Sequence, residues 1–528
     1  MKCFSKLQES CARRAIRATA FKGFRCLSLK SRPMASVPFN MGQPTHETRP
    51  HYLPKPGNLT PGITALEYYN RRLKLADKLS EKSIVVLTSN QVQYSSGSVF
   101  YDFQQDNDFY YLTGWLEPNS VAIIEKVLSS RTDDSVVFHM LAPQKNPQIE
   151  LWEGDRLGPQ GAYDFFNADV VDDIENIKTY MQKLLKNVDV VFWDDKSLNS
   201  GGNSLSKFLS FFNLKALNSG LVTILDLIQK SSKPIRSPKS MIAELRSVKS
   251  PAEINVMHAA GKISSRAFNK AIAKVGSQEP IHTERTLAKF LDYQFVHGGC
   301  DKQAYIPVVA SGKNALTIHY TRNDDLLYKD ELVFVDAGGK LGGYCSDISR
   351  TWPNSPEGFS GPQKDIYEVV LNANKACIDL CCESSHMSVH DIHEFSVKFL
   401  TKELNQLKGF EGISSSTVSR ILYPHYIGHH LGLDLHDVPS LSKINNIVSG
   451  NVLTIEPGLY IPENDNWPKW YRGIGVRVED DIVVGKESKD ILNLSSGCVK
   501  EVVDIESLIS SGKVTTPGAY DETVILDI

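Results

Sequence analysis

The sequence predicts two folded domains: an α/β N-terminal domain and a larger C-terminal domain of long helices and strands. The chain has 528 residues, which is too many for one hydrophobic core. Short apolar runs alternate with helical patterns up to Lys230, as is typical of an α/β domain. A basic segment rich in Ser, Pro and Lys, 231–250, precedes two long helical patterns, so we place a linker and the domain boundary there.

The composition excludes some functional classes. Hydrophobic residues make up 41% of the chain and charged residues 23%, as in ordinary globular proteins. The formal net charge of −3 gives no overall basic field, so we predict no nucleic-acid partner. No apolar run is long enough to cross a bilayer, so we expect no membrane span. The nine cysteines form no C-x-x-C pair, which favours a reducing compartment over a disulfide framework.

The first 32 residues differ from this average. They contain nine Lys and Arg residues and a single acid, Glu9, with Ser, Ala and Phe between them. This composition predicts a mitochondrial transit peptide, 1–32, and a location in the matrix. The alternative is a basic arm that binds an anionic partner. Met34 could start an untargeted form, and residues 33–62, rich in Pro, Gly, Asn and Thr, are predicted to be a linker or surface extension.

Residues 63–230 are predicted to form the α/β domain, with helical patterns over 63–79 and Asp172–Leu185. Strands are expected at Ile84–Thr88, Phe109–Leu112, Val121–Glu125, Val136–Ala142 and Val190–Trp193. The stretch Asp106–Gly114 is dense in acids and aromatics, and is either a rim that meets a substrate or a loop that feeds a buried strand. Lys196–Ser204 is interpreted as a surface loop.

The C-terminal domain is predicted to span 251–503 and to begin with a helix. Ser250 can cap this helix, Pro251 suits its first position, and Glu253 completes a capping box. Long helical patterns run on to Phe295 and recur between Lys364 and Leu404, with strands between and after them. The remaining residues, 504–528, are expected to form a peripheral tail.

The strongest local signal is the stretch Glu331–Pro353. A strand-forming run ends in Asp336, four glycines mark a tight reversal, and a second strand, Tyr344–Trp352, contains Asp347. An antiparallel hairpin that turns near Leu341 would bring the two carboxylates side by side. They cannot both stay ionised there without a positive partner, so either one is protonated or a cation lies between them.

Three further stretches carry polar groups in or at the ends of predicted strands. The segment PHYIGHHLGLDLHD contains four of the 14 histidines, and its two glycines favour a shaped loop. The segment VLTIEPG is an apolar strand that ends in Glu456. In GIGVRVEDD, strand alternation puts Arg477 and Glu479 on the face opposite the apolar residues. Each stretch alone has a local explanation, such as a turn cap or an Arg–Glu pair.

Together these residues predict a metal centre. Asp336, Asp347, Glu456 and Glu479 would repel one another strongly in a shared core without countercharge. Two divalent cations balance four carboxylates. Oxygen-rich ligation with one imidazole suits Mn²⁺, or Co²⁺ or Zn²⁺, better than Cu. A site with two metals and carboxylate ligands indicates hydrolysis.

The same motifs resemble those of a known family. VDAGG…GYCSDISRTWP, HHLGLDLHDVP, LTIEPGLY and RGIGVRVEDDIVV occur in the order found in the aminopeptidase P and prolidase group of metallopeptidases. DNDFYYLTGW is similar to the N-terminal domain of aminopeptidase P. The resemblance covers most of 63–503. It implies an α/β aminopeptidase P N-terminal domain followed by an α+β C-terminal catalytic domain with the pita-bread (creatinase) fold.

The resemblance implies a set of five metal ligands. Two divalent metal ions would be held by Asp336, Asp347, His429, Glu456 and Glu479. Asp347 and Glu479 match the carboxylates that bridge the two ions in the family pattern. No departure from this ligand pattern is visible in the sequence.

Four further residues match catalytic positions of the family. His425 and His436 would contact the substrate and the tetrahedral intermediate, and His319 would be a further catalytic histidine. Arg477 would orient a bridging carboxylate, and the ligand Glu456 would also carry a proton to the leaving nitrogen.

The implied activity is removal of the first residue from a peptide or protein N-terminus, usually before proline. With its basic N-terminus the chain is similar to mitochondrial Xaa-Pro aminopeptidases and fungal intermediate cleaving peptidases. The latter similarity implies removal of one bulky residue, such as Leu, Phe or Tyr, after the presequence protease has cut. General Xaa-Pro peptide turnover, prolidase activity and a metal-free binding module are the alternatives. Homodimers are common in the family, so a homodimer is a further possible assembly.

Overall fold

The computed structural model describes residues 42–128, 135–194 and 219–514. The predicted transit peptide, the loop Lys196–Ser204 and the end of the predicted tail lie outside these residues. Among the described residues, no helix combines the length and the apolar character that crossing a membrane requires.

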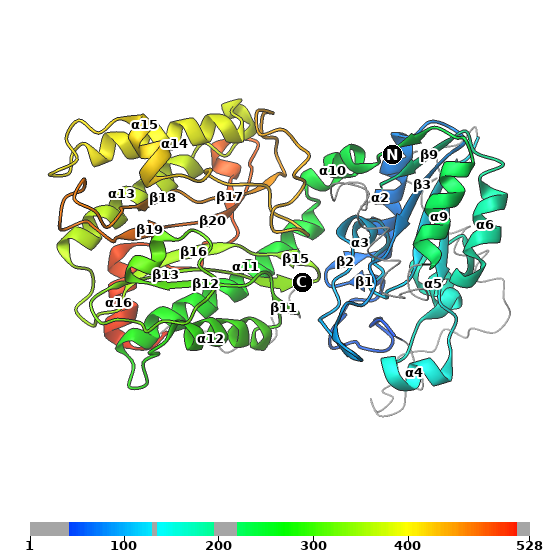
Figure 1. Ribbon diagram of the computed structural model, residues 1–528, viewed down its shortest axis with the longest axis horizontal. Helices are drawn as coiled ribbons and strands as arrows, with labels where there is room; N and C mark the ends of the chain where they lie inside the picture. Colours follow the sequence, from blue (N-terminus) through cyan, green and yellow to red (C-terminus); the bar gives the residue numbers. More distant parts are fainter. Residues whose placement is uncertain (1–41, 129–134, 195–218, 515–528) are drawn as a thin grey trace. The chain divides into compact units, whose positions relative to one another are not determined.

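The N-terminal domain is built around a six-stranded sheet with the order β10-β9-β3-β6-β7-β8 (Figure 1). The strands β3, β6 and β7 pair antiparallel, whereas β9 and β10 continue one edge and β8 the other in parallel. Their bounds are β3 Ser83–Thr88, β6 Val121–Lys126, β7 Val136–Ala142, β8 Val170–Asp173, β9 Val190–Trp193 and β10 Ile235–Arg236. Four of the five predicted strands are therefore confirmed.

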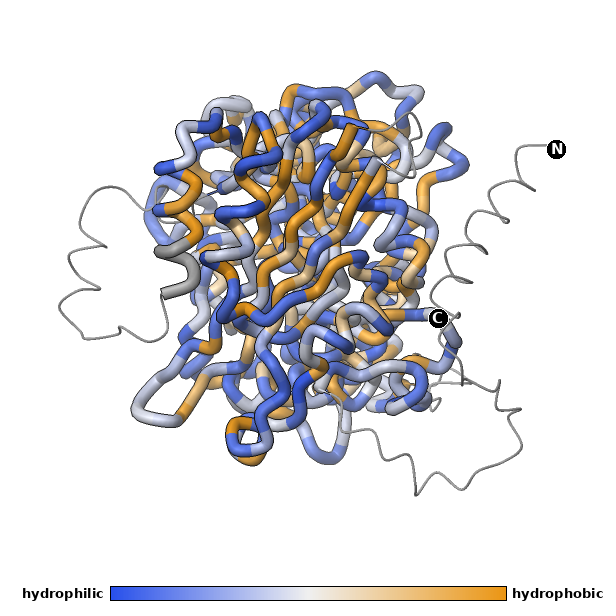
Figure 2. Tube along the Cα trace, turned by 90° about the vertical axis from the view of Figure 1, so that its right-hand side faces the viewer, coloured by the Kyte–Doolittle hydropathy of each residue, from blue (hydrophilic) through white to orange (hydrophobic). Residues whose placement is uncertain are grey.

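Helices cover both faces of this sheet because successive strand residues alternate between two hydrophobic clusters. Val85 and Ile124 pack with helices α2 (Ala65–Asp77) and α5 (Gly158–Phe166). Ile84 and Ile123 pack instead with α6 (Ile177–Leu184) and α9 (Ser219–Lys230). In Figure 2, hydrophobic residues accordingly run along the central strands and hydrophilic ones predominate in the surrounding loops.

The predicted strand Phe109–Leu112 is wrong, because these residues lie in helix α3 (Asn107–Thr113). The carboxylate of Asp106 accepts the backbone N–H of Phe109 and caps the helix, and Gly114 ends it with φ of +71°. All four aromatic and aliphatic side chains of 109–112 are buried. Such a run has no polar face, so its periodicity cannot separate a strand from a short buried helix.

Two segments that we predicted as connections contain regular structure. Strand β1 (Asn58–Thr60) pairs with β2 (Ile63–Thr64) within and just after the predicted linker 33–62. Residues 231–250 contain β10, which extends the N-terminal sheet, and helix α10 (Lys239–Ser247). We predicted this second segment as a linker because it is basic and rich in Pro, but it contains a short helix with a buried face.

The C-terminal domain begins as predicted. Ser250 and Glu253 form a capping box, and Pro251 is the first residue of helix α11 (Pro251–Ala273). Helices α12 (Glu284–His297), α13 (Gly361–Ile378) and α14 (Val389–Leu404) account for the long helical patterns. In Figure 1, α11 and α12 lie on one side of the strands of this domain, and α13 and α14 on the other.

The strands between these helices form small antiparallel sheets, so the domain is α+β. One sheet has the order β12-β13-β16, a second β17-β20-β21, a third β11-β14-β15 and a fourth β18-β19. Their bounds are β11 Lys302–Gln303, β12 Val308–Ser311, β13 Leu332–Ala337, β14 Gly339–Leu341, β15 Tyr344–Cys345, β16 Ile348–Pro353, β17 Val452–Ile455, β18 Gly458–Tyr460, β19 Gly475–Arg477, β20 Asp480–Val483 and β21 Leu492–Asn493.

The end of the chain is not entirely peripheral. Helix α16 (Val502–Ser511) packs against α11, and its residues Val502, Ile505 and Ile509 are buried in the main core. The first eight residues of the predicted tail therefore belong to the C-terminal domain.

Candidate metal centre

The hairpin that carries the first two carboxylates forms as expected. Strand β13 pairs antiparallel with β16, and Asp336 lies opposite Ser349. Gly342 and Gly343 make the turn with φ of +55° and +89°, values that favour glycine. Asp347 lies just before β16 rather than inside a strand. The Tyr305 hydroxyl is 2.5 Å from Oδ1 of both Asp336 and Asp347, so one phenol bridges the two carboxylates.

The register of β17 and β20 brings two more carboxylates together. Ile455, the last residue of β17, pairs with Asp480, the first residue of β20. Glu456 and Glu479 therefore leave the same end of this strand pair. Both lie at the same cavity as the hairpin acids.

The histidine loop runs beside β17 and supplies the imidazole. The Thr454 N–H donates to the carbonyl oxygen of His429, and the Glu456 N–H donates to that of Ile427. A Cβ on Gly428 would lie 1.9 Å from the carbonyl oxygen of Thr454, so only glycine permits this approach. The predicted shaped loop is thus a non-helical segment packed along a strand.

Donor atoms of Asp347, His429 and Glu479 all lie within 4.8 Å of one another. The His429 Nε2 atom is 3.4 Å from Oδ2 of Asp347 and 3.8 Å from Oε1 of Glu456. Its Nδ1 atom is 2.9 Å from the carbonyl oxygen of His430, which sets the ring so that Nε2 faces the acids.

The electrostatics of this donor set test whether a metal fits. Burial raises the pKa of Glu479 well above its ordinary value, that of Glu456 to about 7 and that of Asp336 above its usual range. Burial disfavours the charged form of His429, but the hydrogen bond to Asp347 and the charge of Glu456 outweigh this and raise its pKa to about 9. In contrast, burial would raise the pKa of Asp347, but the hydrogen bond and charge of His429 outweigh it and lower that pKa. A cation that replaces the protons favoured by the other donors would relieve this crowding of acids, so the residues fit divalent metal ions.

Arg477 organises the opposite side of the site. Its guanidinium donates to Asp336, to the Tyr460 hydroxyl over 2.7 Å, and to the Ser349 hydroxyl over 3.0 Å. The Ser349 hydroxyl in turn donates to Glu479 over 2.6 Å. Arg477 therefore orients one carboxylate directly and another through a serine.

His425 is held as a neutral imidazole. Its Nδ1 atom is 2.8 Å from the carbonyl oxygen of Tyr426 and its Nε2 atom 2.9 Å from the hydroxyl of Tyr460. Burial and the charge of Arg477 lower its pKa to about 3. A carbonyl can only accept, so Nδ1 carries the proton and Nε2 accepts from Tyr460.

Every predicted site residue lines one cavity of about 490 Å³. Its lining includes His319, Asp336, Asp347, His425, His429, His436, Glu456, Arg477 and Glu479. The rings of His429 and His436 are 4.4 Å apart between centroids, and His319 and His436 are exposed at the cavity. The structure thus brings all nine side chains together, whereas their individual roles remain predictions.

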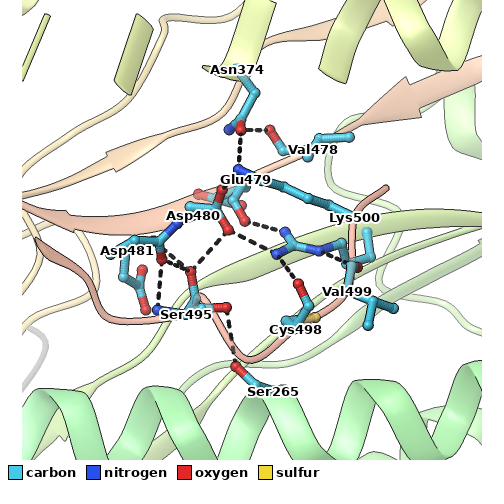
Figure 3. Close-up of polar contacts among 12 residues, drawn as sticks. Ser265, Asn374, Val478, Glu479, Asp480, Asp481, Ser495, Cys498, Val499 and Lys500 are labelled. Carbon is cyan, nitrogen blue, oxygen red and sulfur yellow. Dashed lines mark hydrogen bonds and ion pairs between the residues drawn. The ribbon is translucent and has the colours of Figure 1, made fainter. Parts of the chain in front are cut away.

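A buried network behind the site anchors two of the acids (Figure 3). Arg350 donates to the carbonyl oxygen of Glu479 over 2.5 Å and to Asp480 over 2.8 Å, and Lys500 donates to Asp480 over 2.5 Å. The neighbouring Asp481 accepts the backbone N–H of Asp347 over 3.1 Å. Arg350, which pairs with Asp480, therefore holds the backbone of Glu479, and Asp481 holds that of Asp347.

Comparison with known proteins decides the family. Residues 255–486 match the model of metallopeptidase family M24, and residues 68–192 match that of the aminopeptidase P N-terminal domain. Intermediate cleaving peptidase 55 of Saccharomyces cerevisiae is 48% identical over 483 residues, which cover 91% of this chain and 90% of that protein. The chain belongs to metallopeptidase family M24.

Other M24 relatives extend the likeness. Xaa-Pro aminopeptidase 3 of Rattus norvegicus is 36% identical over 498 residues, covering 92% of this chain and 94% of the relative. The mitochondrial intermediate cleaving peptidase 55 of Arabidopsis thaliana is 31% identical over 473 residues, covering 89% and 88%. The crystal structure of Icp55 from Saccharomyces cerevisiae matches with a TM-score of 0.75 and 45% identity, covering 87% of this chain and 100% of that chain.

These findings confirm the predicted fold and enzyme class. The chain combines an aminopeptidase P N-terminal domain with an M24 pita-bread catalytic domain, and it is a metallopeptidase. Peptides and proteins are the substrates of such enzymes. The M24 family also implies divalent metal ions, for which Asp347, His429 and Glu479 form a possible ligand cluster.

Sequence reasoning missed several residues of this M24 site. Tyr305 stands alone before a strand, and nothing in its neighbourhood signals contact with Asp336 or Asp347. Tyr460 follows Glu456 within a motif that we quoted, but its partners come from two other segments. Arg350 offered a usable signal, since a cation inside an apolar strand needs a buried partner.

Proposed function

We propose that the protein is a two-metal aminopeptidase that removes one bulky residue, such as Leu, Phe or Tyr, from mitochondrial proteins after presequence cleavage. The convergence of four carboxylates and one imidazole at a cavity lined by four further histidines carries this proposal. The similarity to intermediate cleaving peptidases of yeast and Arabidopsis supports the processing role and a mitochondrial location.

The proposed ligands are the five predicted residues, Asp336, Asp347, His429, Glu456 and Glu479. Oxygen-rich donors favour Mn²⁺, with Co²⁺ or Zn²⁺ as alternatives. When bound, two such ions supply Lewis acidity and lower the pKa of water to near neutrality. Arg477 holds the Asp336 carboxylate in place, and Ser349 does the same for Glu479.

The remaining steps fall to side chains of the cavity. Glu456 lines the cavity beside the other proposed ligands and carries a proton to the leaving nitrogen. His425 and His436 line the cavity and contact the substrate and the tetrahedral intermediate, and His319 is a further catalytic histidine. The free α-amine of the substrate pairs with the acidic cluster, which restricts cleavage to the first residue.

A peptide panel tests the processing role. Leu-, Phe- or Tyr-Ser-X peptides should be cleaved faster than X-Pro-X peptides, and metal analysis should find two ions per chain. Faster turnover of X-Pro-X peptides would instead favour a general Xaa-Pro aminopeptidase, a function that the rat relative's name supports. Cleavage of X-Pro dipeptides alone would indicate a prolidase.

The transit peptide offers a second test. The segment Arg25–Cys26–Leu27–Ser28 matches a site at which a first cut after Cys26 would leave Leu27 for removal. We propose that the enzyme trims its own copies in the matrix in this way. N-terminal sequencing of protein isolated from mitochondria should find Ser28 first, and Leu27 first if the enzyme is inactivated. A start elsewhere would contradict self-processing.

A further inference from the structure

The carboxylate of Glu284 is completely buried and fully hydrogen-bonded, although it lies outside the metal centre. Its Oε1 atom accepts from the Ser311 N–H and the Asn314 side-chain amide, each over 2.9 Å. Its Oε2 atom accepts from the Tyr320 hydroxyl and the Asp325 N–H, again over 2.9 Å. All four donors belong to one segment, residues 311–325, which we call the His319 loop.

The His319 loop forms one wall of the cavity. It begins at Ser311, the last residue of β12, continues as the short 3₁₀ helix Gly312–Leu316 and has no regular structure after that. Ile318, His319 and Thr321 line the cavity. The His319 side chain is exposed and makes no hydrogen bond with any other described residue. The position of its imidazole therefore depends on the backbone of the loop.

The His319 loop is hydrogen-bonded to the first residue of helix α12. Glu284 is its first residue, and the Glu284 N–H donates to the carbonyl oxygen of Asp325 while its carboxylate accepts the N–H of Asp325. Asn323 ties the same end of the loop to Pro307 and Val309 of the β12 segment. A fixed loop end on each side of His319 limits how far the imidazole can move.

We propose that Glu284 is a positioning residue that sets the place of His319 in the cavity. The inference rests on the proposed function, because His319 matters only if the cavity is the peptidase site. Glu284 does not line the cavity, and the groups that its carboxylate contacts include no predicted metal ligand. A carboxylate suits this task because its two oxygens accept all four hydrogen bonds from the two ends of the loop. The side-chain amide of glutamine has one oxygen and an NH₂ group, so some of these donors would lose their acceptor.

A double-mutant cycle tests the proposal with the full-length, metal-loaded enzyme and whichever peptide the wild type cleaves fastest. Glu284→Gln should lower kcat/KM by about 10- to 100-fold, because misplacement of a catalytic group by about 1 Å has that effect. In the His319→Ala background the same change should cost less than about threefold, since the group it positions is gone. Glu117→Gln is the control. It replaces a carboxylate that is also buried but lies in the N-terminal domain, and its effect on kcat/KM should be the same with and without His319.

Hydrogen exchange gives a second readout that does not depend on turnover. Amides of 311–325 should exchange faster in Glu284→Gln, while those of the metal-ligand segments keep their protection. If Glu284→Gln fails to fold, Tyr320→Phe removes a single donor to the same carboxylate and should show a smaller effect with the same coupling.

The outcomes separate this inference from the proposed function. Equal costs of Glu284→Gln with and without His319, or unchanged exchange of the loop, would overturn the positioning role while the peptidase stands. A metal-loaded wild type that cleaves no peptide would overturn the proposed function and the role of His319 with it.

Discussion

The guanidinium of Arg477 donates a hydrogen bond to the carboxylate of Asp336 in the interior of the catalytic domain. Its Nε atom also lies 3.8 Å from Oε2 of Glu456. Only 3% of the Arg477 side chain is exposed, against 15% for Asp336 and 16% for Glu456, so this cation neutralises the acids from the buried side of the cavity. The acid cluster therefore depends on Arg477 whenever metal ions are absent.

Arg477→Met should lower the free energy of unfolding of the metal-free protein by about 3–5 kcal/mol, because it leaves buried carboxylates without their cation. Urea denaturation in the presence of a chelator measures this. Arg472→Met is the matched control, since its partner Asp465 is 99% exposed and the pair should contribute less than about 1 kcal/mol. Equal effects of the two substitutions would contradict the account.

Glu456→Ala should abolish hydrolysis while the fold stays intact. Loss of a proton-transfer group costs about 10²- to 10⁴-fold in rate, and loss of a metal ligand adds to this. Steady-state kinetics and circular dichroism check the two parts of the expectation. Retained turnover in protein confirmed to be metal-depleted would count against the metal mechanism itself.

The metal-free protein should lose stability as the pH rises. Between about pH 6.5 and about pH 9, Glu456 and His429 hold more protons in the folded state than in the unfolded chain, because their pKa values are raised to about 7 and about 9. Below about pH 6.5 the buried His425 and His430, with pKa values lowered to about 3 and about 4, act in the opposite direction. The contribution of Glu456 is complete below its unfolded pKa and disappears as the pH passes about 7. The contribution of His429 disappears at higher pH, near 9.

Urea denaturation at about pH 7 and about pH 8.5, above the range in which the histidines with lowered pKa titrate, tests this sign. With chelator present, the protein should be more stable at the lower pH. Saturating Mn²⁺ should abolish or reverse the difference, because metal binding displaces the same protons and is stronger at high pH. A metal-free protein that gains stability with rising pH would contradict the proton uptake that burial of these acids implies.

Arg246 should support the histidine loop from the inter-domain helix α10. It donates over 2.6 Å to Asp434 and over 2.5 Å to Asp437, the two acids that flank His436. Arg246→Met should cost about 1–3 kcal/mol, because Asp437 keeps its buried partner Lys249 at 2.8 Å and the Asp434 side chain is 43% exposed, and it should also lower kcat/KM.

The exposed ion pair of Lys78 with Glu244, 2.6 Å apart, provides the control, because Glu244 lies on α10 like Arg246. Lys78→Met should change the free energy of unfolding by less than about 1 kcal/mol and leave kcat/KM unchanged. Full activity of Arg246→Met would show that the position of His436 does not depend on the hydrogen bonds of Arg246 to Asp434 and Asp437.

Local features of the chain were predictable where the sequence leaves one physical solution. The capping box at Ser250 and the glycine turn of the Asp336 hairpin are of this kind. The acids in and at the ends of predicted strands indicated a cluster only when taken together, because each of them alone also has a local explanation. The helix at Phe109–Leu112 was missed because its caps, Asp106 and Gly114, were interpreted as loop residues.

The sequence by itself determined the order of domains, the strands that end in acids and the need for countercharge, because these depend on residues close in the chain. Only the tertiary structure decided which remote groups complete the site. Tyr305 between two carboxylates, Arg350 behind Glu479 and Glu284 under the His319 loop are examples. Their hydrogen bonds join residues tens to more than a hundred positions apart, and such pairing follows from how strands and helices pack rather than from any local pattern.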